Sequence, residues 1–350
     1  MTRYLIRSAT VLALAALALP GVAQDRDAGE RIAALSSPDP VARAMAACEL
    51  GLMRAADVRP AREPLLALIG DDAPVESRLC RDWDNGFRRD ETSSPGREAA
   101  MALEELGTDV LPELTALLED SRPAAREQAA LALGLIESDQ SIEPLARVLG
   151  DSDARVRSRA AWGLGMIESV RGVEPLLGAL GNDAEPQVRT QAAWALGMIE
   201  SASGVEGLAA AATDSDSGVR EQVAWALGMI ESAAGVTSLQ RLLRDEDAAV
   251  RQQAAWALGM IESADAVESL IETLVDPEPR VREQVAWALG MIESASAAEA
   301  IADALEDETD GRVRRQLIWA LGRVIDSADL EMEPSALAAL LREALLERDR

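Results

Sequence analysis

Residues 188–201 read VRTQAAWALGMIES, and this phrase recurs with small changes along much of the 350-residue chain. Its tryptophan is the clearest marker, because six tryptophans follow one another at intervals of 31 or 32 residues: Trp162, Trp194, Trp225, Trp256, Trp287 and Trp319. Self-similarity at a short fixed period is typical of stacked-repeat proteins and not of a compact domain with one core. Proteins of this architecture mostly bind other molecules along an extended surface.

Each repeat is predicted to hold two helices. The first lies before residues 181–184 and follows Ser169, a candidate N-cap, with apolar residues at helical spacing: Val173, Leu176, Leu177 and Leu180. The second starts at Pro186, in the first-turn position that proline tolerates, and has one apolar stripe: Val188, Ala192, Leu196 and Ile199. Neither helix can bury its stripe alone, so neighbouring hairpins must stack. The predicted fold is an all-α solenoid, an α-α superhelix of about nine helical hairpins with a C-terminal capping helix.

The repeats weaken toward both ends of the chain. Seven regular copies are predicted over residues 107–326, and a capping helix over residues 327–350. Residues 24–106 hold two degenerate copies, the second split by an insertion from Arg81 to Gly96 that contains Trp83 and Phe87. Loops on rigid scaffolds often carry recognition. A solvated excursion is the favoured interpretation of this insertion, because long surface insertions cost little.

The first 23 residues resemble a secretory signal peptide. Arg3 and Arg7 precede an apolar stretch at residues 9–19, and small residues follow before Gln24. Cleavage after Ala23 would remove two arginines and no acidic residue, leaving 61 acidic and 32 basic residues and a net charge of −29. The sequence therefore predicts a periplasmic or secreted protein, without membrane insertion, that repels nucleic acid.

Histidine is absent from the chain. Its absence excludes Ser-His-Asp and Cys-His nucleophilic sites and every metal centre with an imidazole ligand. The cysteines number two, Cys48 and Cys80, and in an exported chain a structural disulfide between them is favoured over two buried thiols.

The run LGDSDARVR at residues 149–157, continued by AAWGLG at residues 160–165, resembles the short HEAT-like repeat of the phycobilin-lyase type. This resemblance covers nearly the whole mature chain. It implies a right-handed α-α superhelix whose second helices line the concave side, and it leaves the function open, because the family includes lyases, hydroxylases and adaptors. Hydroxylases of the family hold iron through His-Glu pairs, which this chain cannot form.

A row of tryptophan and methionine is the candidate partner-binding site. At 100° per residue, Trp162 and Met166 point away from the stripe of Val156, Ala160 and Leu164 that faces the hairpin core. On a concave surface the repeats would form one track, made of the six tryptophans and Met166, Met198, Met229, Met260 and Met291, and edged by Gln191, Gln222, Gln253, Gln284 and Gln316. The alternative is that each tryptophan packs sideways on the next repeat. In an intermediate arrangement, one edge of the ring is buried and the other is exposed to solvent.

Other recurrent residues favour structural roles. The aspartates before the second helices, such as Asp151 and Asp153, have calcium-ligand spacing but are first of all helix caps and partners of the helix dipole, so no metal is expected. The resemblance implies an internal ladder of aspartate and arginine with a structural role, and its arginines would be Arg157, Arg189, Arg220, Arg251, Arg282 and Arg314. Gly165 and its equivalents are expected to allow close helix approach.

These observations predict a non-enzymatic scaffold without a cofactor, a monomer that binds a protein or peptide, possibly basic, along the track. Two alternatives stay open. One is a lyase or oxidoreductase activity of the family, which a pocket joining Glu or Asp with Arg would support, and the other is a purely architectural component of the cell envelope.

Overall fold

The computed structural model describes residues 28–76 and 92–327, and these form two compact units that meet in sequence at Leu106 and Gly107. Both units are helical; the described residues contain no β-strand beyond one isolated bridge between Val75 and Ser93. None of the helices in these two ranges is long and apolar enough to cross a membrane. The all-α class predicted from the repeats is therefore confirmed.

The unit at residues 28–106 holds the degenerate copies. Its helices are α1 (Ala28–Ala34), α2 (Pro40–Leu50), α3 (Ala55–Val58), α4 (Arg62–Leu68) and α5 (Pro95–Glu104). Helices α2 and α4 both pack on α5, and α2 buries Ala44, Ala47 and Leu50 completely. Residues 81–91 of the predicted insertion lie outside the described residues, whereas Pro95 and Gly96 form the first turn of α5.

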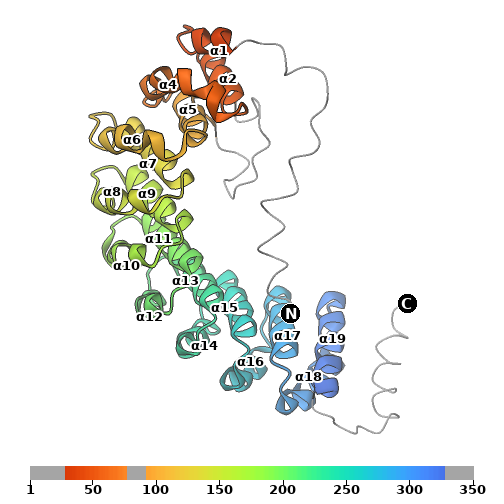
Figure 1. The fold of residues 1–350 in the computed structure, drawn as a ribbon. Coiled ribbons are helices and arrows are strands. Elements are labelled where there is room, and N and C mark those ends of the chain that lie inside the picture. Colours follow the sequence, from red (N-terminus) through yellow and green to blue (C-terminus); the bar gives the residue numbers. More distant parts are fainter. Residues whose placement is uncertain (1–27, 77–91, 328–350) are drawn as a thin grey trace. The chain divides into compact units, whose positions relative to one another are not determined.

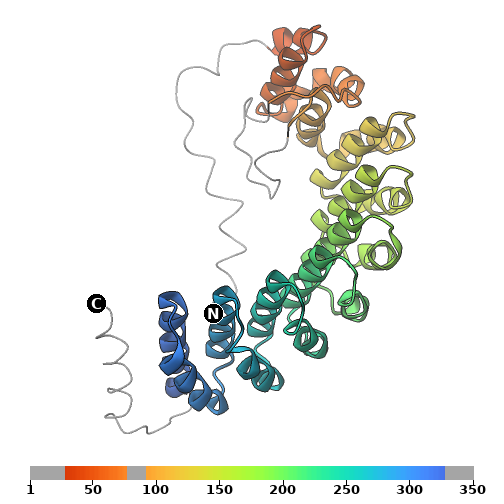
Figure 2. The ribbon, with the colours of Figure 1, turned by 180° about the vertical axis from the view of Figure 1, so that it is seen from behind.

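The unit at residues 107–327 consists of seven helical hairpins. The first helices are α6 (Leu111–Leu117), α8 (Ile142–Val148), α10 (Val173–Asn182), α12 (Val205–Ala211), α14 (Val236–Leu242), α16 (Val267–Thr273) and α18 (Ala298–Asp307). The second helices are α7 (Pro123–Leu135), α9 (Ala154–Met166), α11 (Pro186–Ile199), α13 (Ser217–Ile230), α15 (Ala248–Ile261), α17 (Pro279–Ile292) and α19 (Gly311–Ser327). Within this unit the row of hairpins curves, with the second helices on its inner side (Figures 1 and 2).

Stacking buries the apolar stripes that the hairpins cannot bury alone. Each second helix packs against its own first helix and against the second helices before and after it. In α11 the predicted stripe is buried, with Val188 and Ala192 at 0%, Leu196 at 1% and Ile199 at 7% exposed. This continuous interface is what holds a solenoid together, because each repeat contacts only its neighbours.

Local sequence signals explain where the second helices begin. Pro123, Pro186 and Pro279 occupy the first turn, where a missing backbone N–H costs nothing. Asp153, Asp216 and Asp247 are N-caps that accept a hydrogen bond from a first-turn backbone N–H. The first helices differ from expectation, because Ser169 precedes a 3-10 turn at Val170–Gly172 without a side-chain capping hydrogen bond, and α10 starts only after that turn, at Val173.

Three predictions fall outside the described residues. These are the signal peptide at residues 1–23, most of the capping helix at residues 327–350, and the cysteine partner of Cys48. Cys48 itself lies on α2 and is 4% exposed, whereas Cys80 is not among the described residues, so their disulfide stays a prediction.

Candidate binding face of the second helices

Each ladder tryptophan packs against a glycine of the preceding repeat. A Cβ atom built on Gly228 of α13 would lie 2.7 Å from Cζ3 of Trp256 on α15, which is closer than real Cβ contacts allow. The ring edge therefore fills the space that only a glycine leaves open. The same pairing recurs along the unit: Gly134 with Trp162, Gly165 with Trp194, Gly197 with Trp225, Gly259 with Trp287, and Gly290 with Trp319.

Most of the ladder tryptophans remain partly accessible to solvent. Trp162 is 7% exposed and Trp319 is 39% exposed, while the four tryptophans between them are half-buried. The predicted methionines Met166, Met198, Met229, Met260 and Met291 are half-buried too, as are the glutamines Gln191, Gln222, Gln253, Gln284 and Gln316. The tryptophans thus space the helices with one edge and leave part of the ring at the surface, so both interpretations of the ladder describe part of the geometry.

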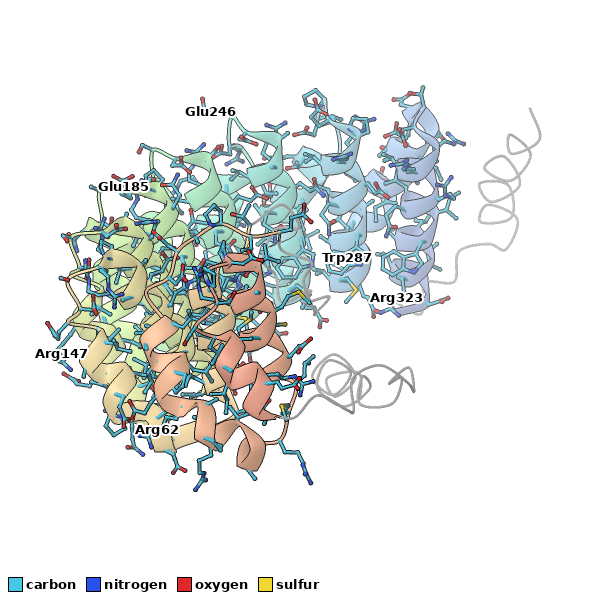
Figure 3. All side chains as sticks on the ribbon, turned by 90° about the horizontal axis from the view of Figure 1, so that it is seen from above. Arg62, Arg147, Glu185, Glu246, Trp287 and Arg323 are labelled. Carbon is cyan, nitrogen blue, oxygen red and sulfur yellow. The ribbon has the colours of Figure 1, made fainter. Side chains whose placement is uncertain are left out.

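These residues share one face of the curved row. All of them come from the second helices, which form the inner layer of residues 107–327 (Figure 1). Trp287 and Arg323 lie toward the carboxyl-terminal halves of α17 and α19, away from the loops that carry Glu185 and Glu246 (Figure 3). We call the surface made by the six tryptophans, the five methionines and the five glutamines the track.

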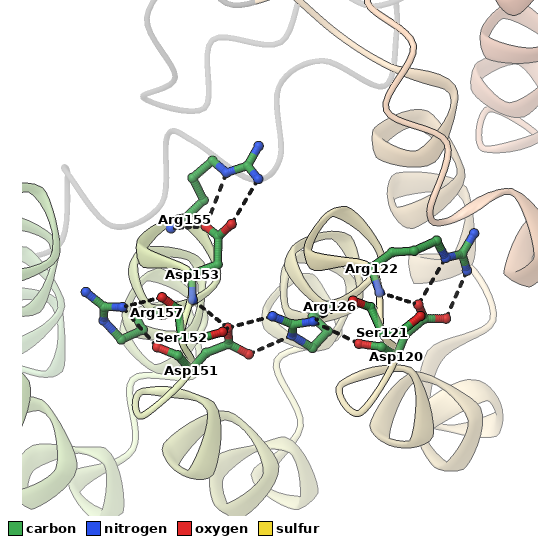
Figure 4. Close-up of polar contacts among 9 residues, drawn as sticks. All are labelled: Asp120, Ser121, Arg122, Arg126, Asp151, Ser152, Asp153, Arg155 and Arg157. Atoms are coloured by element: carbon green, nitrogen blue, oxygen red, sulfur yellow. Dashed lines mark hydrogen bonds and ion pairs between the residues drawn. The ribbon is translucent and has the colours of Figure 1, made fainter.

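A ladder of arginine and carboxylate pairs fixes the loops between hairpins. Arg126 Nε lies 2.7 Å from Asp151 Oδ2 and its Nη2 lies 2.8 Å from Oδ1, while Nη1 donates to the carbonyl oxygen of Asp120 at 2.9 Å (Figure 4). The recurrent pairs are Arg126–Asp151, Arg157–Asp183, Arg189–Asp214, Arg220–Asp245, Arg251–Asp276 and Arg282–Glu308. The predicted ladder is confirmed for Arg157, Arg189, Arg220, Arg251 and Arg282, whereas Arg314 donates to the carbonyl oxygens of Leu305 and Glu308.

The ladder carboxylates of Asp151, Asp183, Asp214, Asp245 and Glu308 have pKa values below their usual range. The Arg126 side chain lowers the pKa of Asp151. Burial alone would raise the pKa of Asp245, but hydrogen bonds from Arg220 and from the backbone N–H of Asp247 outweigh it, so the pKa falls. The ladder aspartates are thus ion-pair partners and loop anchors, and the described residues contain no group of three or more Cys, Asp and Glu arranged to hold a metal ion.

Six glutamates at the ends of the second helices have left-handed backbone conformations. Glu137, Glu168, Glu200, Glu231, Glu262 and Glu293 all have φ between +51° and +54°. Glycine or asparagine usually fills this position after a helix, because a Cβ atom is strained there. Sequence reasoning missed this feature, although the Ile-Glu-Ser that closes most of the phrases marks where each helix must stop.

Three comparisons place the chain among known proteins. A family model of HEAT repeats matches residues 85–165, 111–197, 173–248 and 236–322, which together span more than half of the chain. A search of curated protein sequences found no match.

Three solved structures resemble the chain at low sequence identity, and yeast importin-β, with a TM-score above 0.5, shares its fold. Yeast importin-β (Kap95p) is 16% identical, with a TM-score of 0.63 over 91% of this chain and 49% of its own, so this chain spans about half its length. The CpcE–CpcF complex of phycocyanin lyase from Nostoc is 21% identical, with a TM-score of 0.40 over 67% of this chain and 94% of its own. An engineered protein is 23% identical, with a TM-score of 0.46 over 93% of this chain and 99% of its own. A solenoid of this kind presents an extended surface suited to protein binding.

Proposed function

This chain belongs to the HEAT-repeat family, and we propose that it is a non-enzymatic scaffold that binds a protein or peptide along the track. The observation that carries the proposal is the half-exposed row of tryptophan and methionine on the second helices. Tryptophan is among the residues that contribute most to the binding energy at protein interfaces, and methionine adapts its shape to a partner. A row that repeats in every hairpin suits an extended partner.

The charge of the chain favours a basic partner. The full sequence has 61 acidic and 34 basic residues, a net charge of −27. Such a field attracts cationic proteins and speeds their association. We further propose that the chain acts as a monomer, exported by the signal peptide at residues 1–23, so that Gln24 becomes the first residue and the Cys48–Cys80 disulfide forms after export. N-terminal sequencing of the mature protein tests the export step, which an intact Met1 would contradict.

The absence of enzymatic activity is part of the proposal. The argument in its favour is the sequence, which offers no imidazole for acid–base catalysis or metal binding. The carboxylate and arginine side chains of the ladder are already paired with one another, and they hold loops in place.

Affinity capture from extracts of the source organism tests the scaffold function. The mature chain is expected to retain a partner that the Trp225→Ala, Trp256→Ala double variant loses, because two adjacent track residues are removed. A second pair, Thr237→Ala with Glu268→Ala, changes exposed residues of first helices α14 and α16 and should bind as the wild type does. Circular dichroism must show that all variants keep their helices. Equal capture by the tryptophan variant and the wild type would refute binding along the track.

A further inference from the structure

Two arginines of the chain itself lie on the face of the track. Arg159 stands three residues before Trp162, and its guanidinium carbon lies 5.7 Å from the centre of the Trp162 ring. Arg323 of α19 stands where the earlier second helices have methionine, and it forms an ion pair with Glu293 at the end of α17. Both ends of the track therefore hold a guanidinium group.

Arg159 bridges two neighbouring second helices. Its Nη2 lies 3.6 Å from Oε1 of Glu127 on α7, while the guanidinium covers Trp162 on its own helix α9. Both side chains of the pair are largely buried, with 14% of Arg159 and 16% of Glu127 exposed. Among the six ladder tryptophans, Trp162 alone is fully buried.

The arrangement of a glutamate on one second helix and a tryptophan on the next, as in Glu127 and Trp162, recurs at two other pairs of helices, but there the arginine is missing. Glu221 on α13 is equivalent in the repeat to Glu127, and the next second helix, α15, carries Trp256. Glu283 on α17 is the second equivalent, and the next second helix, α19, carries Trp319. At the register of Arg159, these helices have Gln253 and Gln316 instead. In the other four second helices the position equivalent to Glu127 is held by residues without a carboxylate: Ser158, Thr190, Gln252 and Arg315.

We propose that these two places bind arginine side chains of an extended peptide, one between Trp256 and Glu221 and the other between Trp319 and Glu283. The proposal rests on the proposed function, because it names the chemical group that the track recognises. Each guanidinium would stack on an indole ring and form an ion pair with the carboxylate of the preceding helix, as Arg159 does within the chain.

The electrostatics of the two carboxylates agree with this assignment. Glu221 and Glu283 form no hydrogen bond or ion pair with any residue of 28–76 or 92–327. Partial burial raises the pKa of Glu221, and the nearby charge of Asp247 adds to the effect. A cation beside the Glu221 carboxylate would offset the effects of burial and of Asp247 on its pKa, because a cation favours the charged form.

The spacing of the second helices sets the spacing of the arginines. Trp256 and Trp319 lie on α15 and α19, which are two helices apart. Packed helices lie about 8–10 Å apart, so the two places are separated by about 16–20 Å, which an extended chain covers in about five or six residues. Arginine is expected in preference to lysine, because the planar guanidinium stacks on indole and lysine does not.

The test uses the full mature chain and a fluorescent peptide with two arginines six residues apart in a serine and threonine background. Fluorescence anisotropy at low salt should show binding that weakens when lysine replaces arginine, or when the arginines stand two residues apart. Glu221→Gln should weaken binding about tenfold, because it removes the charge that pairs with the guanidinium. Gln253→Arg should block the first place by supplying the guanidinium from within the chain.

Gln284→Arg is the matched control. It adds the same charge to the same face of a second helix, three residues before Trp287. The preceding helix has Gln252 where α13 has Glu221, so Gln284→Arg should weaken binding much less than Gln253→Arg does. Thr190→Glu should strengthen binding of a peptide with a third arginine, because it supplies the carboxylate that is missing on the helix before Trp225. Absence of binding, or equal affinities for the wild type, Glu221→Gln and Gln253→Arg, would overturn the proposal, and scaffold binding along the track would then rest on the capture experiment alone.

Discussion

A single atom decides how closely adjacent second helices approach one another. At Gly228 a Cβ atom would lie 2.7 Å from Cζ3 of Trp256 and 2.9 Å from the backbone Cα of Ala257. The tryptophan could rotate slightly, but the backbone atom cannot move without shifting the whole repeat. Glycine is therefore required at this register wherever another repeat follows.

Gly228→Ala is expected to destabilise the protein by about 1–3 kcal/mol, as overpacking of a tight interface does. Gly322→Ala is the control, because Gly322 holds the equivalent position in α19 but a Cβ atom there would meet no atom of residues 28–76 or 92–327 within 4 Å. That substitution should stabilise the helix by about 0.5–1 kcal/mol, since alanine loses less entropy on folding. Urea unfolding measures both, and equal effects would contradict the role of the tryptophan contact.

The left-handed glutamates give a second prediction for single residues. Glu262 is exposed and has φ of +53°, which a residue with a Cβ atom adopts at a cost. Glu262→Gly should raise the free energy of unfolding by about 1 kcal/mol. Glu262→Gln keeps the Cβ atom and removes the charge, so its free energy of unfolding should stay near that of the wild type. If Gln stabilises as much as Gly, charge is the cause and backbone strain is not.

Pairs of hairpins are joined by the arginine and carboxylate ladder. Arg220 Nε and Nη2 each lie 2.7 Å from an oxygen of Asp245, and both side chains are 9% exposed. Arg220→Met would leave Asp245 without its cation, and breaking such a pair costs roughly 3 kcal/mol. Adding Asp245→Leu should recover much of that loss, because the unpaired charge is then gone. Urea unfolding of the single and double variants checks both values, and an additive loss would contradict the pairing.

The positions of the helices were largely predictable from the sequence, whereas the degree of burial of the tryptophans was not. Helical spacing and proline placed α10 and α11 within a few residues, because the stripe of Val188 and Ala192 can be buried in one way only. The angle of Trp194 around its helix is known from sequence only to tens of degrees. A rotation of that size separates a buried indole ring from a partly exposed one, so the sequence alone does not decide between them. The glycine that the ring packs against also belongs to another repeat.

The whole molecule depends on ion pairs that recur in register. The pKa of Asp120 is lowered to about 2, chiefly by hydrogen bonds from the Arg122 side chain and backbone. The ladder carboxylates of Asp151, Asp183, Asp214 and Asp245 also have lowered pKa values. A carboxyl group with a folded pKa below its unfolded value stabilises the fold above the unfolded value, and this contribution disappears as the pH falls through the folded value.

Stability should therefore stay nearly constant from about pH 8 to pH 5 and fall between about pH 4 and pH 2, because the ladder carboxylates take up protons together as the chain unfolds. Thermal melts followed by circular dichroism across this range measure the effect. In the Asp245→Asn variant one titrating group is removed, so the melting temperature should be lower at pH 7 and should fall less on acidification. The net charge of −27 opposes this trend, since protonation relieves self-repulsion. If added salt at pH 7 raises the melting temperature while acid still lowers it, the ladder outweighs repulsion; a melting temperature that rises on acidification to pH 3 would show the reverse.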